Sequence, residues 1–417
     1  MAQLDKDIFA AGQSQMQVSE AVALLLARIP RVEGTETVSV IEAEGRVLAR
    51  DLPAPIDLPS FDNSAVDGYA VRFCDLSPGV ETMLPVGGRV AAGHDAVPGD
   101  LAGKAVRIFT GAAMPGGMDM VFMQEDCRAE ADAAVLPPGL VRGANLRLAG
   151  EDIRSGDVAL AGGRILAPED LGLAAALGVT QLEVRRVLKA AIFSTGDEIL
   201  APGTPLEPPK VYDANRFLLH ALLRRLGVAV TDLGILADDP GAIGAALRDA
   251  AATHDLVLTS GGVSTGEEDH VKAALSDTGS LVFWRLAIKP GRPVAMGIIQ
   301  GTPFVGLPGN PVAVFVTFVA VVRPLIAALS GARFEPARLL PVTSGFTYKK
   351  KPGRREYIRV SLRADPFGVW VAEKYPMEGS AVLTSLTRTH GLVELSEDVA
   401  IVQPGDILAY IDYGLVR

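Results

Sequence analysis

The sequence has few cysteines and no excess of basic residues. Only Cys74 and Cys127 occur, far apart and without a CxxC or Cys/His spacing, which argues against a disulfide framework and a structural zinc site. We therefore expect two reduced thiols and a cytoplasmic protein. The formal net charge of −10 argues against a general nucleic-acid binder, whose binding face would be basic. It leaves room for an anionic ligand, because a local pocket can be basic on an acidic protein.

Long apolar runs are also missing. The first 17 residues lack the basic-then-apolar order of a signal peptide. The most apolar run, residues 312–322, ends at Arg323-Pro324 and is too short to span a bilayer. We therefore expect a buried core helix and no membrane partner.

The length of 417 residues exceeds what one hydrophobic core supports, so several domains are expected. The shifts in composition predict a multidomain α/β plus β protein with four parts. Residues 56–140 are predicted to form a β-rich lobe, residues 181–330 an α/β domain, and residues 331–417 a small β-barrel or sandwich. Near the N-terminus, apolar residues at helical spacing predict a helix with Ser19 as its N-cap and Pro30 as its stop.

Strands alternate with helices in the α/β domain. Apolar runs predict strands at residues 187–193, 228–236, 255–259, 281–288 and 304–306. Helices are predicted after Asp213, over residues 242–252 and over residues 312–329, and the first of them should bury Phe217, Leu218, Ala221, Leu222 and Leu226. This order predicts a doubly wound, mostly parallel sheet. The loops after the strands should then meet along one edge.

Those loops are rich in glycine and charge. They contain Thr195-Gly196-Asp197-Glu198, Asp238-Asp239, residues 260–269, Lys289-Pro290-Gly291-Arg292-Pro293 and residues 306–311. Glycines let backbone N–H groups approach a phosphate, and Lys289 and Arg292 supply positive charge. The acidic side chains suit Mg²⁺, water or ligand amines, so we predict a phosphorylated, amine-rich ligand with Mg²⁺. Alternatively, Asp238-Asp239-Pro240 is only a helix cap; no Walker motif supports an ordinary nucleotide fold.

A second unusual segment, FDNSAVDGYAVR at residues 61–72, lies outside the α/β domain. On chemistry alone it could be an Asx-turn with Asp67-Gly68 at the bend. Thr110, at the end of a predicted strand, could simply satisfy backbone groups.

Six motifs in order resemble the molybdopterin molybdenumtransferase family, to which the eukaryotic gephyrin E domain also belongs. They are FDNSAVDGYAVR at 61–72, RIFTGAAMPGG at 107–117, STGDEI at 194–199, SGGVSTGEED at 260–269, KPGRP at 289–293 and GLPGNP at 306–311. The resemblance covers the chain from about residue 15 to the end. It implies an elongated homodimer of four domains, the last of them a small C-terminal β-barrel. Residues 1–55 and 141–180 would form one discontinuous α+β linker domain that dimerises, and the lobe would reach the α/β domain of the partner subunit. The implied reaction is the Mg²⁺-dependent insertion of molybdate into adenylylated molybdopterin with release of AMP.

The resemblance also implies roles for individual residues. Catalytic roles fall on Asp62, Thr110, Glu198, Asp238 or Asp239, and Asp269; three of these, Glu198, Asp238 and Asp269, would hold Mg²⁺. Residues implied to bind the cofactor are Ser194, Thr195, Gly196, Ser260, Gly261, Gly262, Val263, Ser264, Gly266, Lys289, Gly291, Arg292, Pro308, Gly309, Asn310 and Ser380. Arg292 occupies a position where lysine is common in the family, and its planar guanidinium group can form bidentate hydrogen bonds that a lysine ammonium cannot.

Three alternatives accompany this interpretation. The molybdopterin adenylyltransferase of the same pathway shares the α/β fold but should be shorter and lack the lobe. A receptor-clustering scaffold would need a fused partner domain, and a degenerate paralogue would bind molybdopterin without turnover. Contacts with the adenylyltransferase and with acceptor molybdoenzymes are also implied, whereas the choice between molybdate and tungstate stays open.

Overall fold

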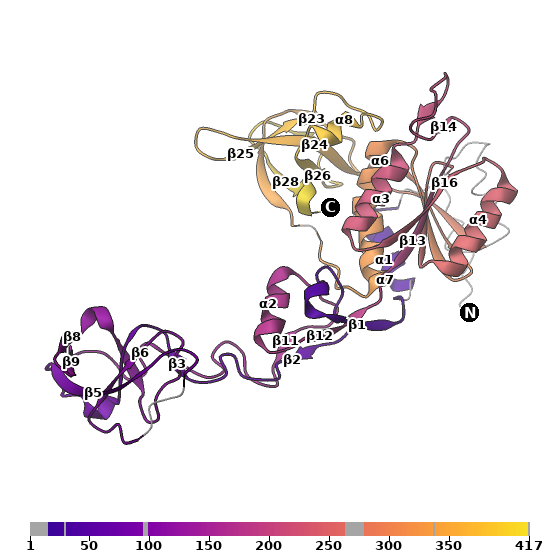
Figure 1. The fold of residues 1–417 in the computed structure, drawn as a ribbon. Coiled ribbons are helices and arrows are strands. Elements are labelled where there is room, and N and C mark those ends of the chain that lie inside the picture. Colours follow the sequence, from indigo (N-terminus) through magenta and orange to yellow (C-terminus); the bar gives the residue numbers. More distant parts are fainter. Residues whose placement is uncertain (1–15, 29–30, 95–98, 263–278, 337, 416–417) are drawn as a thin grey trace.

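The structure is a computed structural model that describes residues 16–28, 31–94, 99–262, 279–336 and 338–415. Figure 1 shows an elongated molecule with a β-rich lobe at one end and a small α+β domain in the middle. An α/β domain and a C-terminal barrel lie together at the other end. This arrangement confirms the predicted fold class of a multidomain α/β plus β protein.

The middle domain is built from two segments that are far apart in the sequence. β1 (Thr35–Ser39) pairs antiparallel with β12 (Gln181–Arg185), and α2 (Pro168–Ala176) contributes Ala174 to their shared core. Two short ribbons lead to the lobe: β2 (Leu52–Pro53) with β11 (Val158–Leu160), and β3 (Asn63–Ser64) with β10 (Leu146–Arg147). The chain therefore leaves this domain, builds the lobe and returns.

The lobe is a six-stranded sheet in the order β7-β4-β6-β5-β9-β8. Its strands are β4 (Gly68–Val71), β5 (Thr82–Val90), β6 (Ala105–Ile108), β7 (Met120–Met123), β8 (Arg128–Glu130) and β9 (Ala133–Leu136). β4 brings the Asp-Gly-Tyr motif between β6 and β7. In the described chain both cysteines are free, with Cys74 exposed and Cys127 half-buried, and burial raises the pKa of the Cys127 thiol to about 11.

The α/β domain has a six-stranded sheet in the order β16-β13-β17-β21-β20-β18. These strands are β13 (Lys189–Thr195), β16 (Ala229–Leu236), β17 (Leu256–Ser260), β18 (Gly279–Arg285), β20 (Pro293–Ile299) and β21 (Thr302–Leu307). The first four in sheet order run parallel. All five predicted strands are present. The sixth, β20, was missed, and it is the strand that pairs antiparallel with both of its neighbours.

Helices cover both faces of this sheet. One core contains residues of α1 (Val18–Arg28), α3 (Asn215–Arg225) and α6 (Pro311–Thr317), and the other contains residues of α4 (Pro240–Thr253). α1 begins one residue before the predicted cap, Ser19, and the predicted stop at Pro30 lies outside the described residues. The predicted face of α3 was only partly right. Leu222 is buried, and Leu218 and Leu226 pack partly buried against the same core, but Phe217 is 54% exposed and Leu219 and Leu223 are buried in its place.

The most apolar helix runs without interruption from Pro311 to Ser330. It consists of α6, a π-helical turn (Phe318–Val322) and α7 (Arg323–Ser330). The helix predicted over residues 312–329 is confirmed, and it continues through Arg323-Pro324 because the wider π turn before Pro324 accommodates a residue that lacks an N–H and would clash with the preceding turn. By length and composition this helix could cross a membrane, but 78% of its apolar window is buried inside the protein. It is the core helix that the sequence predicted.

The C-terminal barrel closes through five strands, because β24 pairs with both β25 and β26. They are β22 (Leu340–Ser344), β24 (Arg355–Ala364), β25 (Trp370–Lys374), β26 (Gly391–Leu395) and β28 (Ile407–Asp412). β23 (Tyr348–Lys349) pairs with β27 (Ile401–Val402), and α8 (Thr384–Thr387) precedes β26. The α/β domain adds β19 (Ile288–Lys289), which pairs parallel with β24. The barrel is therefore hydrogen-bonded to the loop that begins at Lys289.

The structure predicts that Gly68 is essential to the lobe. A Cβ atom at this position would lie 1.7 Å from the carbonyl oxygen of Phe122 in β7, so Gly68→Ala must push two paired strands apart. We expect a loss of about 1–3 kcal/mol in the stability of the lobe and faster limited proteolysis within residues 56–140. Gly116→Ala is the matched control, since nothing lies within 4 Å of a Cβ there. Equal proteolysis of the two variants would contradict this account.

Candidate functional site

The carboxyl ends of the parallel strands lie side by side at one edge of the sheet, as predicted. Ser194 of β13 is in register with Ser260 of β17, and Ser260 is in register with Leu307 of β21. On the other side, Thr195 is in register with Leu236 at the end of β16. The register alone therefore brings these strand ends together.

Side-chain hydrogen bonds tie these loops to each other. Asn215, in the first turn of α3, donates from Nδ2 to Ser260 Oγ at 2.8 Å and to the carbonyl oxygen of Gly309 at 2.6 Å. Ser260 Oγ in turn lies 3.3 Å from the carbonyl oxygen of Pro308 and donates to it. The sequence analysis missed Asn215, although its position two residues after the capping Asp213 marks it as the start of a helix at this edge.

The neighbouring acidic residues Asp238 and Asp239 have different contacts. Asp239 Oδ1 accepts a hydrogen bond of 2.7 Å from the N–H of Ala242, so Asp239 is the N-cap of α4. Asp238 Oδ1 instead accepts a hydrogen bond of 3.2 Å from the hydroxyl of Thr195. The structure therefore assigns the cap to Asp239 and leaves Asp238 facing the strand-end loops.

Two glycines allow close approach at this edge. Gly261 has a φ of +90°, and a Cβ there would lie 2.6 Å from the carbonyl oxygen of Thr195. Gly196 has a φ of +142°, and a Cβ there would lie 2.6 Å from the carboxylate of Glu198. The carboxylate of Glu198 is thus folded back over Gly196, beside the edge.

Three buried polar atoms near the same edge have no hydrogen-bond partner among the described residues. Ser194 Oγ, Asn215 Oδ1 and Thr259 Oγ1 accept or donate no hydrogen bond within the described chain. Ser194 is 2% exposed and Thr259 is fully buried. Because a buried unsatisfied polar group costs about 1–3 kcal/mol, this edge retains unused capacity for a polar ligand.

A separate cavity of about 380 Å³ lies between the α/β domain and the barrel. The predicted residues Lys289, Gly291, Arg292 and Ser380 all line it. The barrel loop is anchored there because the carbonyl oxygen of Ser380 accepts a hydrogen bond of 2.9 Å from the N–H of Val312, at the start of α6. The cavity is therefore adjacent to the loop of Pro308, Gly309 and Asn310.

Lys289 is held by the barrel. Its ammonium donates to Tyr348 Oη at 2.8 Å and lies 3.4 Å from the Glu356 carboxylate, which is 1% exposed. Burial disfavours the charge on Lys289, but the bond to Tyr348 and the charge of Glu356 outweigh burial and raise the pKa of the Lys289 ammonium. Lys289 is therefore a fixed positive charge at neutral pH.

The cavity contains more positive than negative charge. Its ionic residues are the cations Lys289, Arg292, Arg354, Arg359 and Lys374 and the anions Glu356 and Glu378. Lys289 and Arg354 pair with Glu356, and Lys374 pairs with Glu378. Within the described chain no carboxylate pairs with Arg292 or Arg359.

Arg359 is the least expected member of this cavity. It is 8% exposed, it donates to the carbonyl oxygen of Met377 at 3.1 Å, and its Nε has no partner in the described chain. Burial lowers the pKa of Arg359, but a guanidinium stays charged in proteins. The sequence signal was available, because Arg359 interrupts the apolar strand around it.

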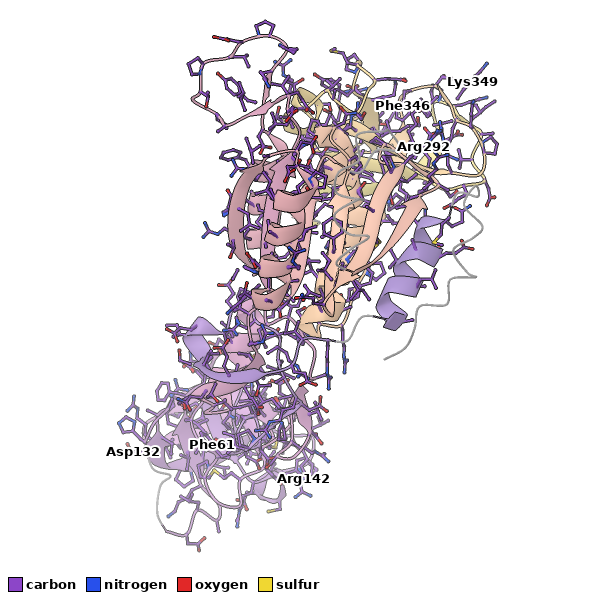
Figure 2. The ribbon with its side chains drawn as sticks, turned by 90° about the vertical axis from the view of Figure 1, so that its right-hand side faces the viewer. Phe61, Asp132, Arg142, Arg292, Phe346 and Lys349 are labelled. Carbon is purple, nitrogen blue, oxygen red and sulfur yellow. The ribbon has the colours of Figure 1, made fainter. Side chains whose placement is uncertain are left out.

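Asp62 and Thr110 lie elsewhere, in the lobe. Asp62 Oδ1 accepts a hydrogen bond of 2.8 Å from the N–H of Ala149. Asp67 Oδ1 accepts from the N–H of Thr110 at 2.8 Å and from its hydroxyl at 2.7 Å, and these two bonds lower the pKa of Asp67. Asp67 thus bonds to a strand end rather than closing an Asx-turn. Figure 2 shows Phe61 in the lobe, at the opposite end of the molecule from Arg292.

Four of the predicted site residues belong to the segment that follows Gly262. Val263, Ser264, Gly266 and Asp269 lie outside the described residues, and Gly262 is the last described residue before them. Among the described residues, no group of three His, Cys, Asp or Glu side chains is arranged to hold a metal ion. The predicted trio of Glu198, Asp238 and Asp269 stays a prediction.

Three protein-family descriptions match the chain. They are the MoeA N-terminal region (domain I and II) at residues 16–178, a probable molybdopterin binding domain at residues 191–328, and the MoeA C-terminal region (domain IV) at residues 341–413. Each part of the candidate site falls within one of these matches.

Similar proteins match over nearly the full chain. The chain is 38% identical over 394 residues to the molybdopterin molybdenumtransferase of Haemophilus influenzae, which covers 94% of this chain and 97% of that relative. It is 36% identical over 387 residues to molybdopterin molybdenumtransferase 2 of Mycobacterium tuberculosis, which covers 90% and 94%. The crystal structure of the molybdopterin biosynthesis moeA protein from Pyrococcus horikoshii OT3 aligns with a TM-score of 0.83 at 30% identity, covering 96% of this chain and 100% of that one.

The contacts of Asp239 predict a purely structural role. Asp239→Ala removes the cap of α4 and should lower stability by about 0.5–2 kcal/mol. Asp239→Asn should have little effect, because asparagine caps helices as well as aspartate does. Hydrogen exchange of the amides in α4 measures both changes. Equal loss of protection in the Asn variant would mean that the charge, and not the cap, is needed.

Proposed function

The chain belongs to the molybdopterin molybdenumtransferase family, and from this premise we propose that it inserts molybdate into adenylylated molybdopterin and releases AMP. The observation that carries the proposal is the contact between two unlike sites. A polar strand edge with unused hydrogen-bonding groups adjoins a basic cavity, and the bond between Val312 and Ser380 joins them.

The strand edge suits the adenylylated pterin. Ser194, Thr259 and Asn215 offer buried polar atoms to the amide and amine groups of a pterin. Gly261 and Gly196 allow backbone N–H groups to approach a phosphate. The hydroxyl of Thr195 holds Asp238 at this edge, where Asp238 would orient the water that attacks the phosphate and accept its proton.

The donor set at this edge also fits Mg²⁺. Asp238 and Glu198 bring carboxylate oxygens to neighbouring loops, and Mg²⁺ prefers such hard oxygen ligands together with phosphate oxygens. We propose that these two side chains hold the ion, with Asp269 as the third acidic ligand. A bound Mg²⁺ would neutralise negative charge on the phosphate during hydrolysis.

The basic cavity suits the oxyanion. Molybdate is a small dianion, and the unpaired guanidinium groups of Arg292 and Arg359 together carry two positive charges. Lys289 and the loop of Ser380 complete a cavity that can donate several hydrogen bonds. The same chemistry would accept tungstate, so charge alone does not separate the two oxyanions.

We further propose that the working site needs two copies of the chain. Asp62 and Thr110 lie in the lobe, and the strand edge and the basic cavity lie at the other end of the same chain (Figure 1). A homodimer that places the lobe of one copy against the α/β domain of the other would assemble the full set. We place this reaction in the cytoplasm, between the molybdopterin adenylyltransferase and the acceptor molybdoenzymes.

The activity is tested by incubating the protein with adenylylated molybdopterin, Mg²⁺ and molybdate and measuring AMP. We expect molybdate-dependent release, which Asp238→Asn lowers by about 10²-fold or more because it removes the group that orients water. Asp239→Asn is the isosteric control and should keep normal turnover. AMP release that is independent of the oxyanion would rule out insertion, and equal loss in both variants would rule out the role of Asp238.

The composite site is tested by mixing two inactive variants, Asp62→Asn and Asp238→Asn. If each site uses Asp62 of one copy and Asp238 of the other, half of the randomly formed dimers carry one intact site. Activity should then return to about a quarter of the wild-type value. Unmixed variants and a mixture kept as preformed homodimers are the controls. Failure to recover activity, with mixed dimers verified by mass, would show that Asp62 does not act across the dimer.

A further inference from the structure

A second basic cavity lies at the opposite edge of the sheet. Its volume is about 820 Å³, and it opens between the middle domain and the α/β domain. Its walls include the residues just before β13, the end of α3 and the end of α7. Because these are the amino ends of the strands and the carboxyl ends of the helices, the cavity is separate from the candidate site.

Arginine dominates the walls of this cavity, which we call the arginine cavity. Its arginines are Arg46, Arg164, Arg185, Arg186, Arg224, Arg225, Arg323, Arg333 and Arg338. Only Glu44 and Glu335 oppose them among the lining residues. On a chain with a net charge of −10, this is a strong local concentration of positive charge.

Carboxylates outside the cavity neutralise three of these arginines. Arg186 pairs with Asp255 at 2.6 Å, and Arg164 pairs with Asp170 at 2.7 Å. Arg46 pairs with Glu36. Within the described residues, the other six arginines have no ion pair.

Two of these six arginines are difficult to explain by folding alone. Arg323 is half-buried, and burial alone lowers the pKa of its guanidinium. The Nε atom of Arg185 is buried and has no hydrogen-bond partner in the described chain. The negative end of the helix dipole stabilises the charges of Arg224 and Arg225, which lie in the last turn of α3. Arg185 lies in a strand and gains no such stabilisation. The side chains of Arg185 and Arg323 are both part-buried, and Arg185 Nη2 donates a hydrogen bond of 3.4 Å to the carbonyl oxygen of Ala49, but neither guanidinium pairs with a carboxylate of the described chain.

Part of the remaining wall is apolar. Val187, Leu226 and Ile326 line the cavity, and Phe334 lies under the guanidinium of Arg323 at 5.9 Å. The volume lies in the range of about 300–1,000 Å³ typical of small-molecule sites. The site therefore combines many planar donors with a surface for an organic group.

We propose that the arginine cavity binds a small organic phosphate that carries at least two negative charges. Guanidinium groups match phosphate oxygens in a bidentate geometry, and the apolar wall receives the organic part. The N–H of Arg333 already donates to the carbonyl oxygen of Gly163 in the middle domain at 2.8 Å. A ligand here would add further links between these domains and so fix the joint from which the lobe extends.

The proposal is tested by calorimetric titration of the full chain with ADP and with inorganic pyrophosphate, at about 0.15 M salt to screen non-specific attraction. We expect saturable binding of both. Arg323→Gln and Arg185→Gln should each weaken it by about tenfold or more, as expected for the loss of a charge-assisted hydrogen bond. If either variant does not fold, as judged by circular dichroism, the exposed pair Arg224→Gln/Arg225→Gln replaces it.

Two controls separate this cavity from other basic surfaces. Arg248→Gln makes the same change of charge on the exposed face of α4 and should bind normally. Lys289→Gln alters the cavity beside Ser380 and should also keep the binding measured here. The proposal would be overturned if the arginine-cavity variants bound both phosphates with unchanged affinity, or if Arg248→Gln lost as much affinity as they do. Loss of binding in Lys289→Gln, or preference for a polyglutamate peptide over both phosphates, would also overturn it.

Discussion

The buried helix from Pro311 to Ser330 is the element on which the rest of this molecule depends. Its side chains share one core with α1, α3 and the barrel residues Tyr357 and Ile411. At its start, the N–H of Val312 bonds to Ser380 and fixes the barrel loop. Just past its end, the N–H of Arg333 bonds to Gly163 of the middle domain. One apolar helix therefore sets the position of both neighbouring domains relative to the sheet, and a cavity lies at each of its ends.

Much of this arrangement followed from the sequence, because parallel sheets obey strong topological rules. Alternating strands and helices predicted that the carboxyl ends of β13, β17 and β21 lie together, and the register of Ser194, Ser260 and Leu307 confirms it. The barrel was predicted from short strands and turns, and its closure confirms that fold class. Such predictions hold because each depends on backbone hydrogen bonding, which varies little with side-chain detail.

The errors have equally physical causes. The strand β20 lies between a proline-rich loop and the turn at Gln300-Gly301, so its short apolar run carried no clear period. Phe217 fitted the apolar spacing of α3 but is exposed, because the buried face of the helix is turned toward Leu219 and Leu223. Asn215 escaped notice because its partners, Ser260 and Gly309, lie far away in the sequence.

The net charge of the chain conceals two local concentrations of positive charge, one in the cavity near each end of the buried apolar helix. The chain carries an excess of ten negative charges, so its general field repels anions. Beside Ser380, two glutamates neutralise three of the cations and leave Arg292 and Arg359 unpaired in the described chain. In the arginine cavity, the carboxylates that pair with Arg46, Arg164 and Arg186 likewise leave Arg185 and Arg323 unpaired there. Arg359 is buried, Arg185 and Arg323 are part-buried and Arg292 is exposed, so each cavity keeps positive charge that no carboxylate of the described chain balances. An acidic surface around them would confine anion binding to these cavities and so contribute to selectivity.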